Sequence, residues 1–466
     1  MSFPPYGAVR DSGLPWVPRI PEHWDVRRNG GLFSQRVETG FPDLPILEVS
    51  LRTGVRVRDM DSLKRKQVMG HREKYKRAAK GDIAYNMMRM WQGALGTAPV
   101  DGLISPAYVV ARPYGGINSA YYSYLYRTDA YLREVNKYSR GIVADRNRLY
   151  WDGFKQMPAL LPPPAEQDRI VAYLRAQDAQ IVRFIRDKRR LIEVLNEQKQ
   201  TLIHRAVTRG LDTKVRLKPS GIDWLAAVPA HWVVKPLKHW VRINQRTLTD
   251  HTDEDYAFRY IDIGTVKTGR LVGEPKMFKF KDAPSRARRV LRKGDIIIST
   301  VRTYLRAVWS VTDSIADLIA STGFAVLTPG KGVDPAYLGY IVQSDSFINR
   351  VAAHSIGIAY PAIAETVLGR FHIALPPTVD EQTSFVRWIE ETSKPLNEGI
   401  AQAEEEIRLM LEYRDRLVAD VVTGQIDVRG WVPGPDDVIV EDAAILGDED
   451  ETIGAQGAED DDDGHE

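Results

Sequence analysis

The sequence predicts an α+β (mixed α/β) fold in which two pseudo-symmetric globular domains are joined by two long antiparallel coiled-coil helices. Two observations lead to this prediction. First, the long stretches 162–212 and 376–427 carry a sustained helical pattern of apolar residues with few helix breakers. Second, a set of short motifs occurs twice along the chain, in the same order and at a nearly constant offset.

The two long stretches are predicted to be helices because their apolar residues recur every seven positions, as in a coiled coil. Each opens with prolines and closes with Val-Thr followed by glycine, which is the usual punctuation of a helix. Ordinary core helices are the alternative, but such lengths are unusual for them. We expect a kink at Pro395. The repeat is carried by Leu174, Ile181, Leu195 and Leu202, flanked by Phe184 and Leu191, and by Ile389, Leu396, Ala403, Met410 and Leu417.

The duplicated motifs begin with a Ser-Gly, Trp, Pro, His-Trp pattern at residues 12–24, which returns at 220–232. Lys-Gly-Asp at 80–82 returns at 293–295, and each long stretch begins with a Glu-Gln pair. A repeat of this length indicates a tandem domain duplication, which most simply folds about a pseudo-two-fold axis. We therefore expect a first domain at 1–161, a first long helix at 162–212, a second domain at 213–375, a second long helix at 376–427 and an acidic disordered tail at 428–466.

Within the domains, short apolar runs bounded by turn residues predict strands, and longer periodic runs predict helices. The expected strands are 44–51, 82–86, 108–111, 260–263, 295–300 and 324–327, and the expected helices are 119–135 and 335–351.

Composition excludes several classes of protein. The chain has no Cys, which excludes disulfides, cysteine-based zinc sites and a thiol nucleophile. It has neither an apolar run of membrane-spanning length nor a signal-peptide pattern, so we expect a cytoplasmic protein with no membrane partner. The net charge of +2 combines an acidic end with a basic remainder: residues 435–466 hold 14 acidic residues and no Lys or Arg, which leaves +16 on the rest. A basic body of this kind suggests a polyanionic partner.

No catalytic motif is convincing. Phe3-Pro4-Pro5-Tyr6 resembles part of an adenine-methyltransferase motif, but Phe3 cannot make the hydrogen bond that Asp, Asn or Ser provides there. Pro42-Asp43 with Glu48 resembles a nuclease motif that lacks its lysine, and no glycine-rich phosphate loop is present. We therefore expect no catalytic residue, no metal site and no cofactor.

Two basic runs, one in each copy, precede the Lys-Gly-Asp motifs and could bind a nucleic-acid backbone. Such a run is usually a solvated face, but its occurrence in both copies favours contact with a long polyanion. The candidates for backbone contact are Lys64, Arg65, Lys66, Arg72, Lys74, Lys76 and Arg77 in the first copy, and Arg286, Arg288, Arg289 and Arg292 in the second.

Polar, aromatic and basic segments follow the Lys-Gly-Asp strands and could read DNA bases. Asn and Gln can pair with adenine, Arg with guanine, and a Thr methyl can contact thymine. In the alternative interpretation, the two aromatic residues belong to the core and the arginines bind only phosphate. The candidates are Asn86, Arg89, Trp91 and Gln92 in the first copy, Thr300, Arg302, Tyr304 and Arg306 in the second, and Arg146, Arg148 and Tyr360 in later loops.

Taken together, these motifs resemble the specificity subunit of type I restriction-modification systems, over about residues 12–428. The resemblance implies two target-recognition domains that each read one half of a split, asymmetric site in double-stranded DNA. It implies that the paired helices act as a ruler and as a docking surface for two modification (methyltransferase) subunits, which bind S-adenosylmethionine and methylate adenine. It further implies that restriction subunits, which are ATP-dependent translocases and nucleases, can join them.

The resemblance also implies that the chain itself is not an enzyme. Pro395 and the acidic tail depart from the family pattern. Three alternatives remain open: a specificity subunit of a related modification system that is not type I, a stand-alone DNA-binding regulator, and a cryptic enzyme.

Overall fold

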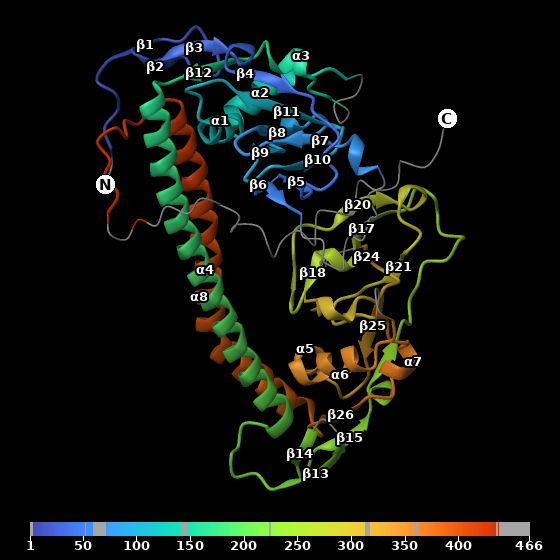
Figure 1. Ribbon diagram of the computed structural model, residues 1–466. Helices are drawn as coiled ribbons and strands as arrows, with labels where there is room; N and C mark the ends of the chain where they lie inside the picture. Colours follow the sequence, from blue (N-terminus) through green and yellow to red (C-terminus); the bar gives the residue numbers. More distant parts are fainter. Residues whose placement is uncertain are drawn as a thin grey trace. The chain divides into compact units, whose positions relative to one another are not determined.

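The computed structural model describes residues 3–51, 53–58, 71–141, 147–222, 225–312, 317–357, 361–434 and 437. The chain forms two compact units: unit 1 comprises Met1–Arg189 with Glu404–Glu466, and unit 2 comprises Arg190–Ala403. Each unit contains a globular region and part of each of two long helices (Figure 1).

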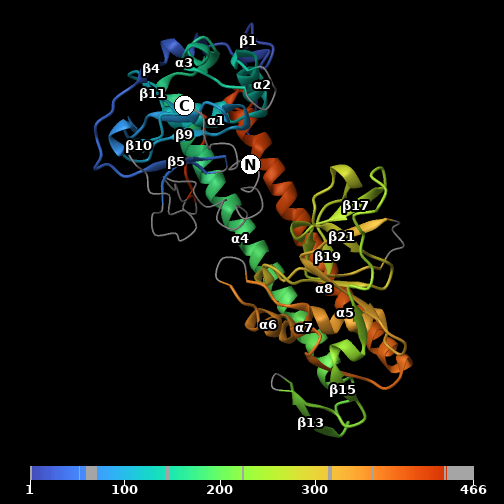
Figure 2. The same cartoon turned by 90° about the vertical axis from the view of Figure 1, so that its right-hand side faces the viewer.

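The two long helices confirm the most prominent prediction from the sequence. They are α4 (Pro164–Arg209) and α8 (Val379–Val422), and they run side by side in both views (Figures 1 and 2). Within unit 1, α4 and α8 are antiparallel, because Asp178 pairs with Arg414 at 2.7 Å and Lys188, further along α4, pairs with the earlier residue Glu406 of α8. Within unit 2 the two helices are also antiparallel. A Cβ added at Gly399 of α8 would lie 3.2 Å from Leu195 Cδ1 of α4, and Lys199 Nζ, further along α4, donates to the earlier residue Asn397 of α8 at 2.8 Å.

The apolar residues expected to form the seam of α4 are buried to different extents. Leu174 and Ile181 are buried, whereas Leu195 and Leu202 are only partly covered. Leu191, expected beside the seam, is 42% exposed. Helix α8 is continuous through Pro395, which has no N–H to donate to the preceding turn; the kink expected there stays a prediction.

Unit 1 is built on an antiparallel sheet in the order β4-β11-β8-β9, beside three two-stranded pairs and one small β5-β6 hairpin. Aromatic residues of α1 and α2, including Tyr122 and Tyr131, fill the core next to this sheet. The strands are β1 (Val9–Asp11), β2 (Arg19–Pro21), β3 (Asp25–Arg28), β4 (Phe33–Arg36), β5 (Leu47–Ser50), β6 (Gly54–Val57), β7 (Lys76–Ala78), β8 (Ile83–Asn86), β9 (Leu95–Thr97), β10 (Gly102–Ile104), β11 (Tyr108–Pro113) and β12 (Pro158–Leu161), and the helices are η1 (Asn29–Gly31), η2 (Arg72–Lys74), η3 (Met90–Gln92), α1 (Ser119–Tyr126), α2 (Asp129–Tyr138) and α3 (Trp151–Phe154).

Unit 2 repeats this plan with the sheet β16-β25-β22-β23, and it adds a second four-stranded sheet, β20-β17-β24-β21, in which β17 and β24 are parallel. The strands are β13 (Leu217–Ile222), β14 (Leu225–Pro229), β15 (Val233–Pro236), β16 (Val241–Ile243), β17 (Ala257–Ile261), β18 (Val266–Lys267), β19 (Arg270–Leu271), β20 (Lys276–Lys279), β21 (Ala287–Val290), β22 (Ile296–Ser299), β23 (Val308–Ser310), β24 (Leu318–Ser321), β25 (Phe324–Pro329) and β26 (His372–Leu375), and the helices are η5 (Leu237–His239), η6 (Ile263–Thr265), η7 (Phe280–Asp282), η8 (Thr303–Leu305), α5 (Pro335–Gln343), α6 (Asp345–Ala353) and α7 (Glu365–Leu368).

The two units therefore share an order of elements as well as a set of motifs. Every expected strand overlaps an observed one, but each of the two expected domain helices is in fact two helices. Thr128 lies between α1 and α2 and caps α2, since its side chain accepts from the backbone N–H of Tyr131; Ser344 lies between α5 and α6. A capping residue of this kind starts a new helix even within an apolar periodic run.

The repeated His-Trp and Glu-Gln motifs fasten the start of each long helix to its globular region. In unit 1 the buried Glu166 carboxylate accepts from Tyr6 Oη at 2.5 Å and from Trp24 Nε1 at 3.1 Å, and it pairs with His23 Nε2 at 2.7 Å. In unit 2 Glu381 accepts from Trp232 Nε1 at 3.3 Å and pairs with His231 Nε2 at 2.9 Å. The duplicated motifs therefore have a structural role: each forms a joint that connects the start of a long helix to its globular region.

Candidate nucleic-acid interface

Two equivalent loops carry most of the candidate base-reading residues. In unit 1 the loop joins β8 to β9 and contains η3, and in unit 2 it joins β22 to β23 and contains η8. The loop of unit 1 closes at Gly93, whose φ of +88° suits glycine. The corresponding residue in unit 2 is Arg306, which adopts a left-handed φ of +54°, and Arg302 at the other end of η8 has φ +52°. Two arginines are thus held in a conformation that costs a residue with a Cβ about 1–2 kcal/mol.

In the loop of unit 1, Arg89 and Gln92 are exposed, whereas the other two candidates help to build the loop. Asn86 Oδ1 accepts the backbone N–H of Met88 at 2.9 Å. Trp91 is partly buried against the core of unit 1, and its Nε1 donates to the carbonyl of Met88 at 3.0 Å. Arg89 and Gln92 are therefore the side chains of this loop best placed to meet a ligand.

In the loop of unit 2, Tyr304 is the most accessible candidate, at 55% exposed. Thr300 is buried, and its hydroxyl donates to the carbonyl of Gly323 at 3.0 Å, so its role in this structure is to hold the loop. Arg306 pairs with Asp345 at the surface, where both side chains remain 40% or more exposed. A surface pair of this kind is worth about 0–1 kcal/mol, so a DNA group could replace the carboxylate at little cost.

The remaining base-reading candidates lie in the later loops. Arg148 is exposed, and its backbone pairs with that of Arg140 in both directions, at 2.9 and 3.0 Å. Arg146 and Tyr360 lie outside the described residues, as do the backbone candidates Lys64, Arg65 and Lys66.

The described part of the first basic run is largely tied to its own unit. Arg72 donates to the carbonyl of Leu44 at 2.8 Å, and Lys76 donates to the carbonyls of Pro106 and Tyr108 at 2.8 and 2.7 Å. Burial lowers the pKa of Lys76. By contrast, Lys74 is exposed and so is available to a phosphate.

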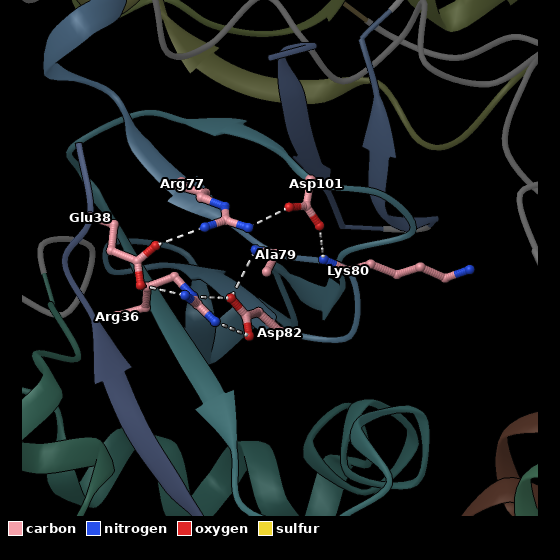
Figure 3. Close-up of polar contacts among 7 residues, drawn as sticks. All are labelled: Arg36, Glu38, Arg77, Ala79, Lys80, Asp82 and Asp101. Atoms are coloured by element: carbon pink, nitrogen blue, oxygen red, sulfur yellow. Dashed lines mark hydrogen bonds and ion pairs between the residues drawn. The ribbon is translucent and has the colours of Figure 1, made fainter. Parts of the chain in front are cut away.

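Figure 3 shows that Arg77 bridges two carboxylates, Asp101 at 2.6 Å and Glu38 at 3.1 Å. The pKa of Asp101 is lowered, first by the backbone N–H of Lys80, which it accepts at 2.8 Å, and then by Arg77. The hydrogen bond to Asp101 in turn raises the pKa of Arg77. Contact between Arg77 and DNA would therefore compete with an existing pair.

In the basic run of unit 2, too, some residues contact other groups of the same unit and others are exposed. Arg288 lies over the ring of Phe280, 4.7 Å from its centroid, and Arg289 pairs with Glu365 at 2.7 Å. Arg286 and Arg292 are exposed at the surface. Backbone binding by these residues stays a prediction, for which Lys74, Arg286 and Arg292 have the most suitable positions.

Sequence reasoning recognised the repeated Lys-Gly-Asp motif without assigning it a role. Its aspartate is buried in both units: Asp82 accepts from Arg36 Nε at 2.6 Å, and Asp295 accepts from Arg246 at 2.5 Å (Figure 3 for unit 1). Gly81 and Gly294 have φ near +90°, which lets the chain turn into the central strand of each sheet. The repetition of the motif was the available signal, but the arginine that pairs with its aspartate is distant in sequence.

The described residues contain no group of three or more His, Cys, Asp or Glu side chains arranged to hold a metal ion. In the same ranges, no helix combines the length and apolar character that a bilayer crossing requires.

The comparison with known proteins finds similarity in structure. No protein-family model and no curated protein matches the chain. A solved chain from a study of complex assembly and conformational transition of the type I restriction-modification system matches with a TM-score of 0.57 and 16% identity, covering 87% of this chain and 99% of that one. The present chain therefore has the fold of that protein.

Two further solved chains also match over most of their lengths. The HsdS subunit from Thermoanaerobacter tengcongensis has a TM-score of 0.38 and 17% identity, covering 88% of this chain and 98% of that one. The type I restriction-modification S subunit from M. genitalium has a TM-score of 0.33 and 13% identity, covering 86% and 96%.

Proposed function

We propose that this chain is the DNA-binding specificity subunit of a type I restriction-modification complex, in which each unit reads one half of a bipartite, asymmetric site. The observation that carries the proposal is the pair of equivalent loops, β8–β9 and β22–β23, each at the same place on a repeated sheet. The loops differ in sequence where their side chains are accessible: Arg89 and Gln92 stand in one, and Tyr304 and Arg306 in the other. Equivalent scaffolds with different reading side chains suit an asymmetric target.

In this proposal, side chains of the two loops contact the edges of the bases directly. Exposed basic residues contact the phosphates. Arg89 and Arg306 can donate two hydrogen bonds to guanine, Gln92 can pair with adenine, and Tyr304 can contact a base edge or a sugar. Lys74, Arg286 and Arg292 would add attraction that is independent of sequence and weakened by salt. The chain would serve as the reading subunit, and a methyltransferase partner would supply S-adenosylmethionine and the chemistry.

Helices α4 and α8 are assigned the roles of spacer and docking surface for two modification subunits, with restriction subunits joining the assembly. One heptad of helix rises about 10 Å, equivalent to about three base steps of DNA. Deleting Lys188–Val194 together with Ala403–Leu409 keeps the apolar seam in phase. Both half-site sequences should survive this deletion while the spacer between them shortens by up to about three base pairs.

The test of the proposal is co-expression of the chain with the methyltransferase encoded beside it, followed by affinity purification and methylation of random-sequence duplexes. We expect a stable complex that methylates adenine in one bipartite sequence, and no methyl transfer by either protein alone. Sequence-specific binding by a homodimer that does not retain the methyltransferase would instead identify a stand-alone regulator. Methyl transfer by the purified chain alone would identify a cryptic enzyme.

A further inference from the structure

The end of the described chain is fastened to helix α4 of unit 1. After α8, the backbone N–H of Asp427 donates to the carbonyl of Pro4 at 2.9 Å. Trp431 is buried, and its ring packs edge-on against Tyr173 with centroids 5.6 Å apart. Arg169 of α4 donates to the carbonyl of Trp431 at 2.6 Å. These contacts give the last segment of the chain a fixed starting point.

The segment then follows α4 toward the C-terminal end of that helix. Asp437 Oδ1 accepts from Gln180 Nε2 at 2.7 Å, and its Oδ2 accepts the backbone N–H of Gly434 at 2.8 Å. Between Trp431 and Asp437 the contacted residue of α4 thus moves from Tyr173 to Gln180. Seven helical residues rise about 10 Å, a distance that six residues of chain, with a reach of up to about 20 Å, span easily.

Positive charge lies next along the same helix. Arg183 follows Gln180 by three positions and so lies on a neighbouring part of the helix surface, where it is exposed. The side chain of Arg186 is 72% exposed, and its contact with Asp187 is long, at 3.5 Å. From residue 181 to 189, α4 carries four basic residues and one acidic residue. We call residues 183–189 the basic segment of α4.

The chain that continues from Asp437 has the opposite charge. Residues 438–466 hold 12 acidic residues and no Lys or Arg, and the first two of them are Glu441 and Asp442. Four or five residues of extended chain reach about 13–17 Å, enough to bring this pair to the basic segment from the anchor at Gln180. A short tether also keeps the local concentration of the pair near the millimolar range.

We infer that Glu441 and Asp442 dock on Arg183 and Arg186, so that the acidic tail is an intramolecular partner of α4. Docked there, the tail covers positive charge that other polyanions would otherwise meet. This inference rests on the anchor and on charge complementarity, and it does not depend on the proposed function.

The absence of native Cys allows a clean distance measurement. Spin labels are placed on the full chain at Ala179→Cys, an uncharged position of α4 outside the basic segment, and at Ala444→Cys, and their separation is measured by pulsed dipolar EPR. A docked tail gives a narrow distribution in low salt. The distribution should broaden on adding 1 M NaCl, where the screening length is about 3 Å, and in the variant Glu441→Gln/Asp442→Asn. The matched control neutralises Asp461 and Asp462, which removes the same charge further along the tail, and it should leave the distribution narrow.

Two results would overturn the inference. In the first, the unmodified tail gives a distribution as broad as that of the Glu441→Gln/Asp442→Asn variant. In the second, a mixture of singly labelled chains gives the dipolar signal, which would place the tail on a second copy. A heparin column provides a readout of the covered charge: the Glu441→Gln/Asp442→Asn variant should elute at higher salt than the equally charged distal control. Equal elution of the two variants would contradict coverage of the basic segment by this pair.

Discussion

The Arg306→Gly variant distinguishes the contribution of Arg306 to folding stability from its contribution to DNA binding. The change removes left-handed strain of about 1–2 kcal/mol, adds about 0.5–1 kcal/mol of chain entropy cost, and gives up a surface ion pair worth about 0–1 kcal/mol. These contributions nearly cancel, so the free energy of unfolding should change by less than about 1.5 kcal/mol in either direction. If Arg306 contacts a base, as proposed, its loss should weaken DNA binding by about 1–3 kcal/mol, or roughly 5- to 150-fold.

The assay pairs urea unfolding with quantitative binding of the methyltransferase complex to its selected duplex. Asp317→Gly is the matched control, since Asp317 in the same unit has φ +55° and lies outside the loop. It should give up similar strain without any change in DNA affinity. Unchanged DNA affinity in Arg306→Gly would refute a binding role for Arg306. Destabilisation by more than about 3 kcal/mol would show that the left-handed backbone of Arg306 is not strained.

Three further predictions concern single side chains. Tyr304→Ala should leave the free energy of unfolding within about 0.5 kcal/mol, because the ring is exposed, yet change specificity in one half-site only; a change in neither half-site, found by duplex selection, would exclude base contact. Asp101 should stay paired with Arg77 from pH 8 to 5, because its lowered pKa means that the pairing is lost only as pH falls below the ordinary range of about 4. The salt dependence of DNA binding should steepen by up to about one unit in Asp101→Asn throughout that window; an unchanged slope in the variant would count against competition between Asp101 and DNA for Arg77. Glu166→Ala should destabilise the chain by about 3–5 kcal/mol in urea unfolding, because it leaves buried donors without an acceptor. Glu381→Ala should destabilise it by less, because the Glu381 carboxylate is more exposed; a larger effect at Glu381 would contradict this dependence on burial.

The long helices and the duplication were predictable because each leaves a periodic or repeated trace in the sequence. The seven-residue repeat predicted α4 and α8, and the paired motifs predicted two similar units. The same reasoning failed at Thr128, where a local capping hydrogen bond divides one expected helix into two. It also placed Leu191 beside the seam, although it is largely exposed, because a repeat pattern does not give the local separation of two helices.

The candidate site was less predictable because the role of a polar residue depends on partners distant in sequence. Nothing in the sequence around Arg77 shows that Glu38 and Asp101 pair with it, and its contact with a phosphate stays a prediction. The sequence placed Trp91 and Tyr304 in equivalent positions, but it could not show that the first is half buried while the second is exposed. The left-handed backbone at Arg302 and Arg306 likewise leaves no signal in residue type.

In the proposed function, the two units read the two halves of one DNA site for a methyltransferase partner. The most direct test of this proposal is base-resolution mapping of methylated adenine in cells that carry this chain and its methyltransferase, compared with cells carrying Arg89→Ala or Tyr304→Ala. We expect one bipartite motif in the unmodified strain, relaxation of one half-site with Arg89→Ala, and relaxation of the other half-site with Tyr304→Ala. Identical methylation in all three strains, or methylation that persists when this chain is deleted, would contradict it.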